Sequence, residues 1–375
     1  MTNTAAKSSL FESARIGGLD LPNRLVMAPM TRTRASQDGV AQPIMATYYA
    51  QRASAGLIIA EASTPNLVGR TYPNTAAIYG PEHVAGWRGV TDAVRAAGGR
   101  MFLQLQHGGR VGHPDNSGHV PVAPSAIALP GTIFTQGGHV PTVVPREMTV
   151  DEIRATVADF AAAARNAVEA GFAGVEVHSA NGYLLHQFLA RGSNERTDEY
   201  GGSVANRIRF TVEVVAAVVD AIGADRVGVR VSPGLTVNGI EEGDTAEIYD
   251  ALVPALAEVG PAYLHVVYAD PGNPVFAAIR ANWAGTLIAN PVLPGEGLPA
   301  DGGKAAGERL LEAGADLVSL GRAFLANPDL VERLSAGASL NELRGNLMYV
   351  GGDEGYTDYP ALGAETSLVG GVAVV

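Results

Sequence analysis

Short apolar runs alternate along the chain with longer alanine-rich stretches in which apolar residues recur at helical spacing. This alternation is typical of parallel strands connected by crossover helices. Eight strands are predicted, at residues 24–28, 56–60, 100–105, 174–177, 226–231, 263–267, 286–289 and 316–320. Helices are predicted at residues 43–55, 81–97, 150–170, 204–222, 245–259 and 303–313.

Two of the predicted helices have recognisable ends. Thr149 and Ser203 are residue types that cap helix N-termini, and Gly171 and Gly223 are typical of C-termini. Eight strand–helix units without a Pro/Ser-rich linker favour an α/β fold that closes as a (β/α)8 TIM barrel, rather than a doubly wound sheet. We expect a single barrel domain over residues 1–375, in which residues 1–9 and 363–375 are flexible tails.

Two connections are too long to be simple turns. Residues 106–147 follow the third predicted strand, and residues 178–203 follow the fourth. The C-terminal strand ends of such barrels carry the chemistry, and long loops in compact domains are usually functional or disordered. We therefore expect a loop excursion after strand three and an active-site loop after strand four.

Composition narrows the functional classes. The formal net charge of −12 disfavours a nucleic-acid partner, because few cations are available to displace counterions from a phosphate backbone. The chain has no cysteine, which excludes disulfides and thiolate chemistry. No segment reaches the roughly 18 apolar residues of a membrane span, and residues 1–10 lack the apolar run of a signal peptide. A cytoplasmic location without a membrane partner is the expectation.

Three reactive side chains follow the fourth predicted strand. His178 and Asn181 can direct hydrogen bonds at one oxygen atom, and Tyr183 is a weak acid that can donate a proton. Together they suit the polarisation and protonation of a substrate. The alternative is that these side chains only satisfy one another within the loop.

Polar residues also interrupt two other predicted strands. Gln104 lies in an otherwise apolar run, and a flavin pyrimidine edge would offer it matched donors and acceptors. Arg230 ends the fifth strand, where burial would require an anion or a polar ligand. A salt bridge from Arg230 to Glu61 or Glu176 is the alternative.

The ends of strands seven and eight suggest a phosphate site. Barrel enzymes commonly hold phosphate in the loops after these strands. Gly321 and Arg322 follow the eighth strand, and Asn290 follows the seventh. A glycine amide and a guanidinium are suitable phosphate ligands.

Several long motifs, in order along the chain, resemble the old yellow enzyme family of flavin-dependent ene-reductases. They are Asn23-Arg-Leu-Val-Met-Ala-Pro-Met-Thr-Arg32, Tyr49-Ala-Gln-Arg-Ala-Ser-Ala-Gly56, Glu176-Val-His-Ser-Ala-Asn-Gly-Tyr-Leu-Leu-His-Gln-Phe188, Arg196-Thr-Asp-Glu-Tyr-Gly-Gly-Ser203 and Gly355-Tyr-Thr-Asp-Tyr-Pro360. The resemblance extends from Leu10 to about Leu362. It implies a TIM barrel that binds flavin mononucleotide (FMN) and uses NADPH or NADH as reductant.

The resemblance also implies roles for individual residues. The FMN-binding residues would be Ala28, Pro29, Met30, Thr31, Ala62, Gln104, His178, Arg230, Asn290, Gly321 and Arg322. Substrate would contact Thr31, Tyr72, Gln106, His178, Asn181 and Tyr356. His178 and Asn181 would hold the oxygen of an enone, enal, maleimide or nitroalkene, while Tyr183 protonates its α-carbon. The nicotinamide would use the same pocket in a ping-pong sequence.

Two positions depart from the family pattern. Gln106 stands where many relatives have tryptophan, so that wall of the pocket should be more open and more polar. The loop after strand seven reads Ala289-Asn290-Pro291 and lacks the glycine-rich sequence of many relatives. Substrate preference therefore does not follow from the resemblance, and the phosphate role that the resemblance implies carries over better to Arg322 than to Asn290.

Three other functional classes compete with a flavin-dependent reductase. A Schiff-base aldolase needs a lysine at a strand end, but the only lysines are Lys7 and Lys304, in a polar tail and at a helix start. A metal-dependent hydrolase needs more strand-end ligands than His107 and His178, so no metal is expected. A flavin store would not need Tyr183. A reductant other than nicotinamide, and a monomeric or homodimeric state, stay open.

Overall fold

The computed structural model describes residues 9–293, 295 and 297–363. Eight parallel strands close into a barrel in the order of the chain. The strands are β3 (Leu25–Met27), β4 (Leu57–Ser63), β5 (Met101–Leu105), β10 (Gly174–Ser179), β11 (Val227–Val231), β12 (Tyr263–Ala269), β13 (Thr286–Pro291) and β14 (Leu317–Leu320). The (β/α)8 prediction is confirmed, and all eight predicted strands are present. The predicted tails lie outside the described residues, except for Ser9 and Gly363.

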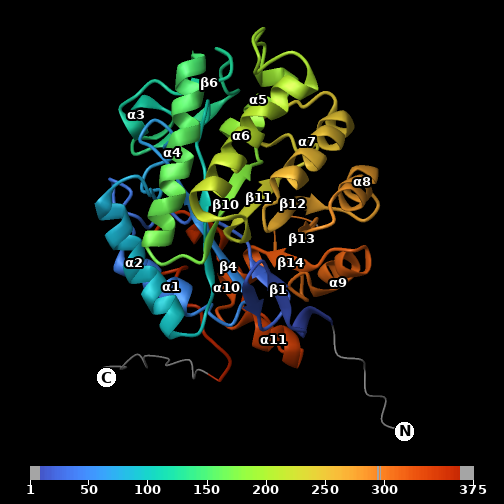
Figure 1. Cartoon of the computed structure of the whole chain (residues 1–375). Helices are drawn as coiled ribbons and strands as arrows, with labels where there is room; N and C mark the ends of the chain where they lie inside the picture. Colours follow the sequence, from blue (N-terminus) through green and yellow to red (C-terminus); the bar gives the residue numbers. More distant parts are fainter. Residues whose placement is uncertain (1–8, 294, 296, 364–375) are drawn as a thin grey trace.

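The main helices surround the barrel (Figure 1). They are α1 (Pro43–Ala50), α2 (Pro81–Ala96), α4 (Val150–Glu169), α6 (Val204–Ile222), α7 (Thr245–Val259), α8 (Pro274–Asn282) and α9 (Lys304–Glu312), with α10 (Arg322–Ala326) and α11 (Leu330–Ala336) after the last strand. Thr149 and Ser203 cap α4 and α6, as their residue types predicted. Helix α1 ends five residues before its predicted end, and α8 was not predicted.

An N-terminal hairpin closes one end of the barrel. Its strands, β1 (Ala14–Ile16) and β2 (Leu19–Leu21), pair antiparallel. Ile16 and Leu21 pack against inward-facing residues of the barrel strands, such as Val26 and Phe102. Because this apolar plug closes the N-terminal ends of the strands, only their C-terminal ends remain open to a ligand.

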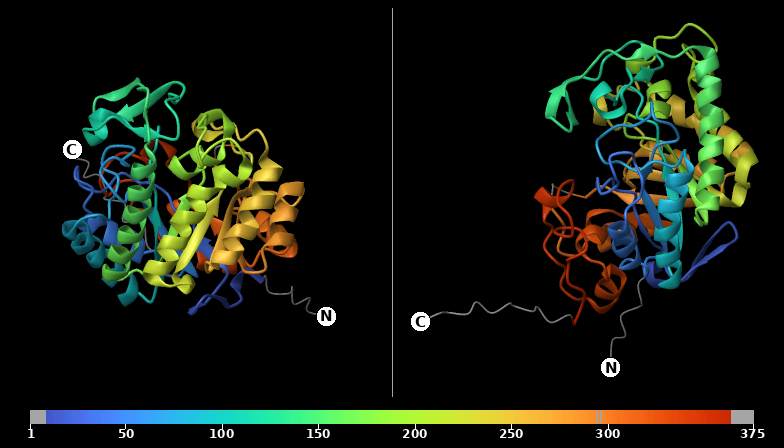
Figure 2. Two further views of the ribbon diagram at one scale, coloured as in Figure 1. Left: turned by 45° about the horizontal axis from the view of Figure 1, so that its top comes forward. Right: turned by 90° about the vertical axis from the view of Figure 1, so that its left-hand side faces the viewer.

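The connection after β5 forms the predicted excursion. It contains α3 (Pro114–Ser117), β6 (Val122–Ala123), β7 (Thr132–Thr135), β8 (Gly138–Pro141) and β9 (Arg146–Glu147). Strands β7 and β8 pair as a hairpin that projects from the body of the barrel (Figure 2). The connection after β10 contains α5 (Leu184–Leu189). Within the described residues, no helix combines the length and the apolar character needed to span a bilayer.

Candidate active site

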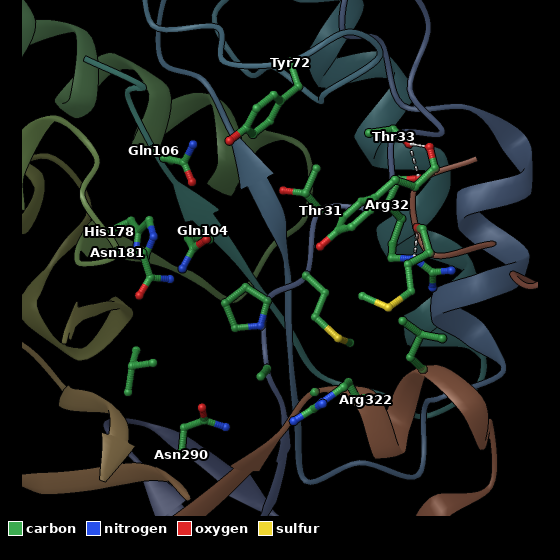
Figure 3. A pocket seen from close by; sticks show the side chains of 18 of the residues that line it. Thr31, Arg32, Thr33, Tyr72, Gln104, Gln106, His178, Asn181, Asn290 and Arg322 are labelled. Atoms are coloured by element: carbon green, nitrogen blue, oxygen red, sulfur yellow. Dashed lines mark hydrogen bonds between the residues drawn. The ribbon is translucent and has the colours of Figure 1, made fainter. Parts of the chain in front are cut away.

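A cavity of about 780 Å³ opens at the C-terminal ends of the barrel strands. This location and size are typical of ligand sites in barrel enzymes. Most of the predicted site residues line it, namely Ala28, Pro29, Met30, Thr31, Tyr72, Gln104, Gln106, His178, Asn181, Tyr183, Arg230, Asn290, Gly321 and Arg322. Figure 3 shows His178, Asn181 and Gln104 on one side of the cavity, with Asn290 and Arg322 at another end.

Two predicted site residues are not brought to the cavity. Tyr356 is fully buried and stacks on Tyr48, with ring centroids 4.0 Å apart and an angle of 6° between the rings. The guanidinium of Arg32 lies over the Tyr356 ring and holds it in this position. The prediction that Tyr356 forms a substrate wall is therefore corrected. Ala62 is buried on β4 and is not a lining residue.

Other aromatic residues line the mouth of the cavity instead. Phe134 and His139 reach it from the β7–β8 hairpin, and Tyr268 reaches it from β12. Tyr349 also lines the cavity, from a C-terminal segment. Arg32 binds this segment by donating a hydrogen bond to the carbonyl oxygen of Met348. Sequence reasoning identified the excursion that contains the hairpin, but it singled out none of these residues. For Phe134 and His139, an aromatic side chain within the long connection after strand three was the available signal.

The turn after β10 presents Asn181 to the cavity in a constrained backbone conformation. Asn181 has a φ of 56°, and its N–H donates to the Oγ of Ser232 at 2.8 Å. The side chain of Asn238 donates to the carbonyl oxygen of Asn181, also at 2.8 Å. Gly182 follows at a φ of 78°, where a Cβ would lie 2.6 Å from the carbonyl oxygen of Val237. Only glycine fits at position 182 without a shift of the neighbouring loop.

The polar atoms facing this turn lack protein partners. His178 Nδ1, Asn181 Oδ1 and Arg230 Nε are buried and have no hydrogen-bond partner. His178 and Arg230 lie opposite each other in the pairing of β10 with β11. A buried polar atom without a partner costs roughly 1–3 kcal/mol, so the three atoms indicate a polar ligand.

The environment fixes the protonation states of His178 and Tyr183. Burial lowers the pKa of His178 well below its usual value, and the nearby charge of Arg230 lowers it further. Burial also raises the pKa of Tyr183 well above its usual value, and the hydroxyl of Tyr72 adds to this shift. His178 is therefore a neutral hydrogen-bonding group, and Tyr183 keeps its proton at neutral pH.

Arg230 and Gln104 form the polar base of the cavity. The amide nitrogen of Gln104 donates to Glu176 Oε1 at 2.8 Å. Within the described part of the chain, no carboxylate lies within ion-pair distance of Arg230, so neither salt bridge considered above, to Glu61 or to Glu176, is formed. Burial lowers the pKa of Arg230, although Glu176 opposes this effect. The guanidinium of Arg230, with its buried Nε unpartnered, can therefore donate hydrogen bonds to an electron-rich ring in the cavity.

The opposite end of the cavity suits a phosphate. Arg322 directly follows Gly321 at the end of β14 and donates to the carbonyl oxygen of Gly295 at 3.2 Å. A Cβ at Gly321 would lie 3.1 Å from the sulfur of Met30, so a side chain here would crowd the cavity wall. The side chain of Asn290 is bound through its nitrogen to the carbonyl oxygen of Ser319. The arrangement fits FMN, with hydrogen-bonding groups for a ring system at one end and a cation at the other.

These features define a class: a (β/α)8 barrel with a polar ligand cavity at the C-terminal ends of its strands. The chain belongs to the NADH:flavin oxidoreductase / NADH oxidase family, whose model matches residues 9–341. This family includes the old yellow enzymes, as the motifs predicted. FMN is its cofactor, a nicotinamide dinucleotide is its reductant, and reduction of activated alkenes is its reaction.

Individual relatives support the same assignment. A probable flavin mononucleotide-dependent alkene reductase from Leishmania infantum is 43% identical over 356 residues, which cover 92% of this chain and 95% of the relative. A solved morphinone reductase in complex with tetrahydroNAD is 44% identical, with a TM-score of 0.88 over 94% of this chain and 98% of the other. The old yellow enzyme homologue of Zymomonas mobilis is 38% identical, with a TM-score of 0.89 over 94% and 99% of the two chains.

Proposed function

We propose that the chain reduces the C=C bond of α,β-unsaturated carbonyl and nitro compounds, with Tyr183 as the proton donor. One observation carries the proposal: a neutral His178, the turn residue Asn181 and a protonated Tyr183 converge on one cavity. Enones, enals, maleimides and nitroalkenes share an oxygen conjugated with the double bond. Two hydrogen-bonding groups and one acid are what such a substrate requires.

His178 and Asn181 hold the substrate oxygen. Hydrogen bonds from their side chains withdraw electron density from the conjugated system, so the β-carbon becomes a better hydride acceptor. The φ of 56° at Asn181, together with its backbone bond to Ser232, constrains the backbone from which that amide projects. The buried Nδ1 of His178 has no partner in the described part of the protein, and Asn181 would donate to the substrate oxygen through its amide nitrogen.

The remaining step is a proton transfer from Tyr183. FMN, which Gln104, Arg230 and Arg322 would hold, would supply hydride chemistry at the β-carbon with NADPH or NADH as the reductant. The hydroxyl of Tyr183 gives its proton to the α-carbon, and the resulting phenolate recovers a proton from solvent, so the product has gained two hydrogens. Because the pKa of Tyr183 is raised, this hydroxyl is protonated again before the next turnover.

Reductant and substrate are proposed to use the cavity in turn. The oxygen-binding groups and the proposed ring-binding residues, Gln104 and Arg230, line the same cavity. A ping-pong order follows, because two ligands that need one place cannot be bound together. The solved morphinone reductase with tetrahydroNAD supports nicotinamide binding in such a barrel. Thr31, Tyr72 and Gln106 would contact the substrate, and Gln106 makes that wall polar.

Product analysis tests the proposal. The FMN-loaded protein is incubated with NADPH or NADH and 2-cyclohexenone, and cyclohexanone is measured by gas chromatography. We expect stoichiometric conversion, and a large loss in the variant that combines His178→Ala with Asn181→Ala. Oxidation of the nicotinamide without a saturated product would overturn the assignment of substrate class.

A further inference from the structure

Beneath the cavity, inside the barrel, lies a buried polar network centred on Glu176. Its carboxylate is fully buried on β10, two residues before His178. Three side chains bind it, one from β5 and two from β12: Gln104 Nε2 at 2.8 Å, the hydroxyl of Tyr263 at 3.1 Å and His265 Nδ1 at 2.8 Å. The other ring nitrogen of His265 lies 2.7 Å from the Oγ of Ser319. The proposed mechanism uses none of these groups except Gln104.

Glu176 is an anion despite its burial. Burial alone would raise the pKa of its carboxyl, but His265, Arg230 and the hydrogen bond from Gln104 lower it below its usual value. An ionised carboxylate can only accept hydrogen bonds. The nitrogen of the Gln104 amide must therefore face Glu176, and its carbonyl oxygen is left for the cavity.

This orientation gives the base of the cavity a defined pattern. Gln104 on β5 offers an acceptor, and Arg230 on β11 offers donors, with β10 lying between the two strands. A flavin pyrimidine ring carries one N–H group flanked by carbonyl oxygens. An acceptor beside donors complements that edge, whereas the reversed amide would place a donor against the ring N–H.

We propose that Glu176 is a positioning residue, which fixes the Gln104 amide with its oxygen toward the flavin pyrimidine. The inference rests on the proposed placement of that ring against Gln104. Glu176 does not contact the cofactor itself, since it is not a lining residue of the cavity. Its effect on FMN binding is therefore indirect, and we expect it to pass through Gln104 rather than through Arg230, whose burial Glu176 also offsets.

A double-mutant cycle on FMN affinity tests the proposal. Apoproteins of the wild type, Glu176→Gln, Gln104→Ala and the double variant are titrated with FMN, and the fluorescence of free FMN is followed. A glutamine at position 176 can donate to the oxygen of Gln104 and so permit the reversed amide. We expect each single change to weaken FMN binding by about tenfold or more. Adding Glu176→Gln to Gln104→Ala should cost little further affinity.

Ser319→Ala is the matched control. It removes a hydrogen bond from the same network but leaves the contact between Glu176 and Gln104 in place. We expect its FMN affinity to equal that of the wild type. Thermal unfolding of each apoprotein shows whether the variants are folded.

The titrations give different results if the proposed flavin site is wrong and if only the role of Glu176 is wrong. If Gln104→Ala leaves FMN affinity unchanged, the placement of the pyrimidine ring is wrong. If both single variants bind FMN weakly but their costs add in the double variant, Glu176 does not act through Gln104. If Glu176→Gln does not fold, neutron diffraction from the wild-type FMN complex decides. The deuterated amide nitrogen of Gln104 should then face Glu176 with the amide oxygen toward the flavin, and an amide turned the other way, with its oxygen facing Glu176, would overturn the proposal.

Discussion

The rings of His178 and Tyr183 lie 5.4 Å apart, at an angle of 47°. His178 lies at the end of β10 and Tyr183 lies in the turn that leads from β10 into α5, so one strand–helix connection supplies an oxygen-binding group and the proton donor of the proposed reaction. Their environments move their pKa values in opposite directions, downward for His178 and upward for Tyr183. Opposite shifts in neighbouring groups are typical of sites with separate acid–base roles.

Tyr183→Phe should separate the two half-reactions. Loss of a general acid typically costs about a hundredfold or more in rate, so oxidation of the reduced flavin by 2-cyclohexenone should slow by that order. Reduction of the flavin by NADPH or NADH should be nearly unchanged, since it needs no proton from Tyr183. Stopped-flow absorbance measures each half-reaction.

Tyr72→Phe is the comparison for that variant. It removes the hydroxyl that interacts with Tyr183 but leaves the proposed donor in place. We expect a smaller effect on the oxidation step than in Tyr183→Phe. Equal rates for Tyr183→Phe and wild type in both half-reactions would exclude Tyr183 as the donor.

The oxidative half-reaction should be independent of pH over a wide interval. His178 has already lost its proton at pH 6.5, its ordinary pKa, because its pKa in the protein is lower. Tyr183 still carries its proton at pH 10.0, its ordinary pKa, because its pKa is raised. Neither group should therefore titrate between these limits. A rate profile with a break near pH 6.5 that disappears in His178→Ala would contradict the assigned state of His178.

The raised pKa of Glu61 should make the stability of the folded protein depend on pH. This carboxyl is fully buried on β4, and burial raises its pKa from 4.5 to about 7, although the backbone N–H of Arg32 and the hydroxyl of Tyr49 bind it. Between pH 4.5 and 7 the folded state holds a proton that the unfolded state has lost, so stability should fall as pH rises. Urea unfolding of wild type and Glu61→Gln at pH 5 and 8, with FMN in excess, measures the effect.

The difference in unfolding free energy between those two proteins is the informative quantity. It should shift by up to about 3 kcal/mol in favour of Glu61→Gln between the two pH values. The fixed cost of replacing the carboxyl cancels in this comparison. A difference that does not change with pH would show that Glu61 is ionised throughout.

Arg322→Ala should weaken the binding of FMN but not of riboflavin. If Arg322 contacts the phosphate, its loss removes a charge-assisted interaction, worth on the order of tenfold in affinity or more. Riboflavin lacks the phosphate and should bind the variant and the wild type alike. Titration of the apoproteins by flavin fluorescence measures both affinities. An equal loss for both flavins would assign Arg322 to the pocket wall instead.

The sequence identifies the barrel because its buried parallel strands are continuous apolar runs. It places the strand ends less well, since polar residues inside the barrel interrupt these runs. The predicted fourth strand ends at Val177, but β10 continues through His178 and Ser179, which are buried. Helix α8 escaped prediction because only Phe276 and Ile279 form its buried face.

Residues of the site also differ in how well the sequence predicts their position. Residues at strand ends, such as Gln104 and Arg230, reach the cavity because strand geometry fixes their direction. Tyr356 does not, since its orientation depends on a stack with Tyr48 and on Arg32, all distant in sequence. Phe134 depends on how the β7–β8 hairpin folds back, which no local pattern specifies. Motif matches therefore identify the chemistry more reliably than they identify the walls of the pocket.

The most direct test of the account is an anaerobic absorbance experiment in two steps. NADPH or NADH is added to the FMN-loaded protein until the visible flavin band is lost, and 2-cyclohexenone is then added. We expect the band to return, with one equivalent of cyclohexanone formed per flavin. A flavin that is reduced by the nucleotide but not reoxidised by this enone, or by an enal, a maleimide or a nitroalkene, would contradict it.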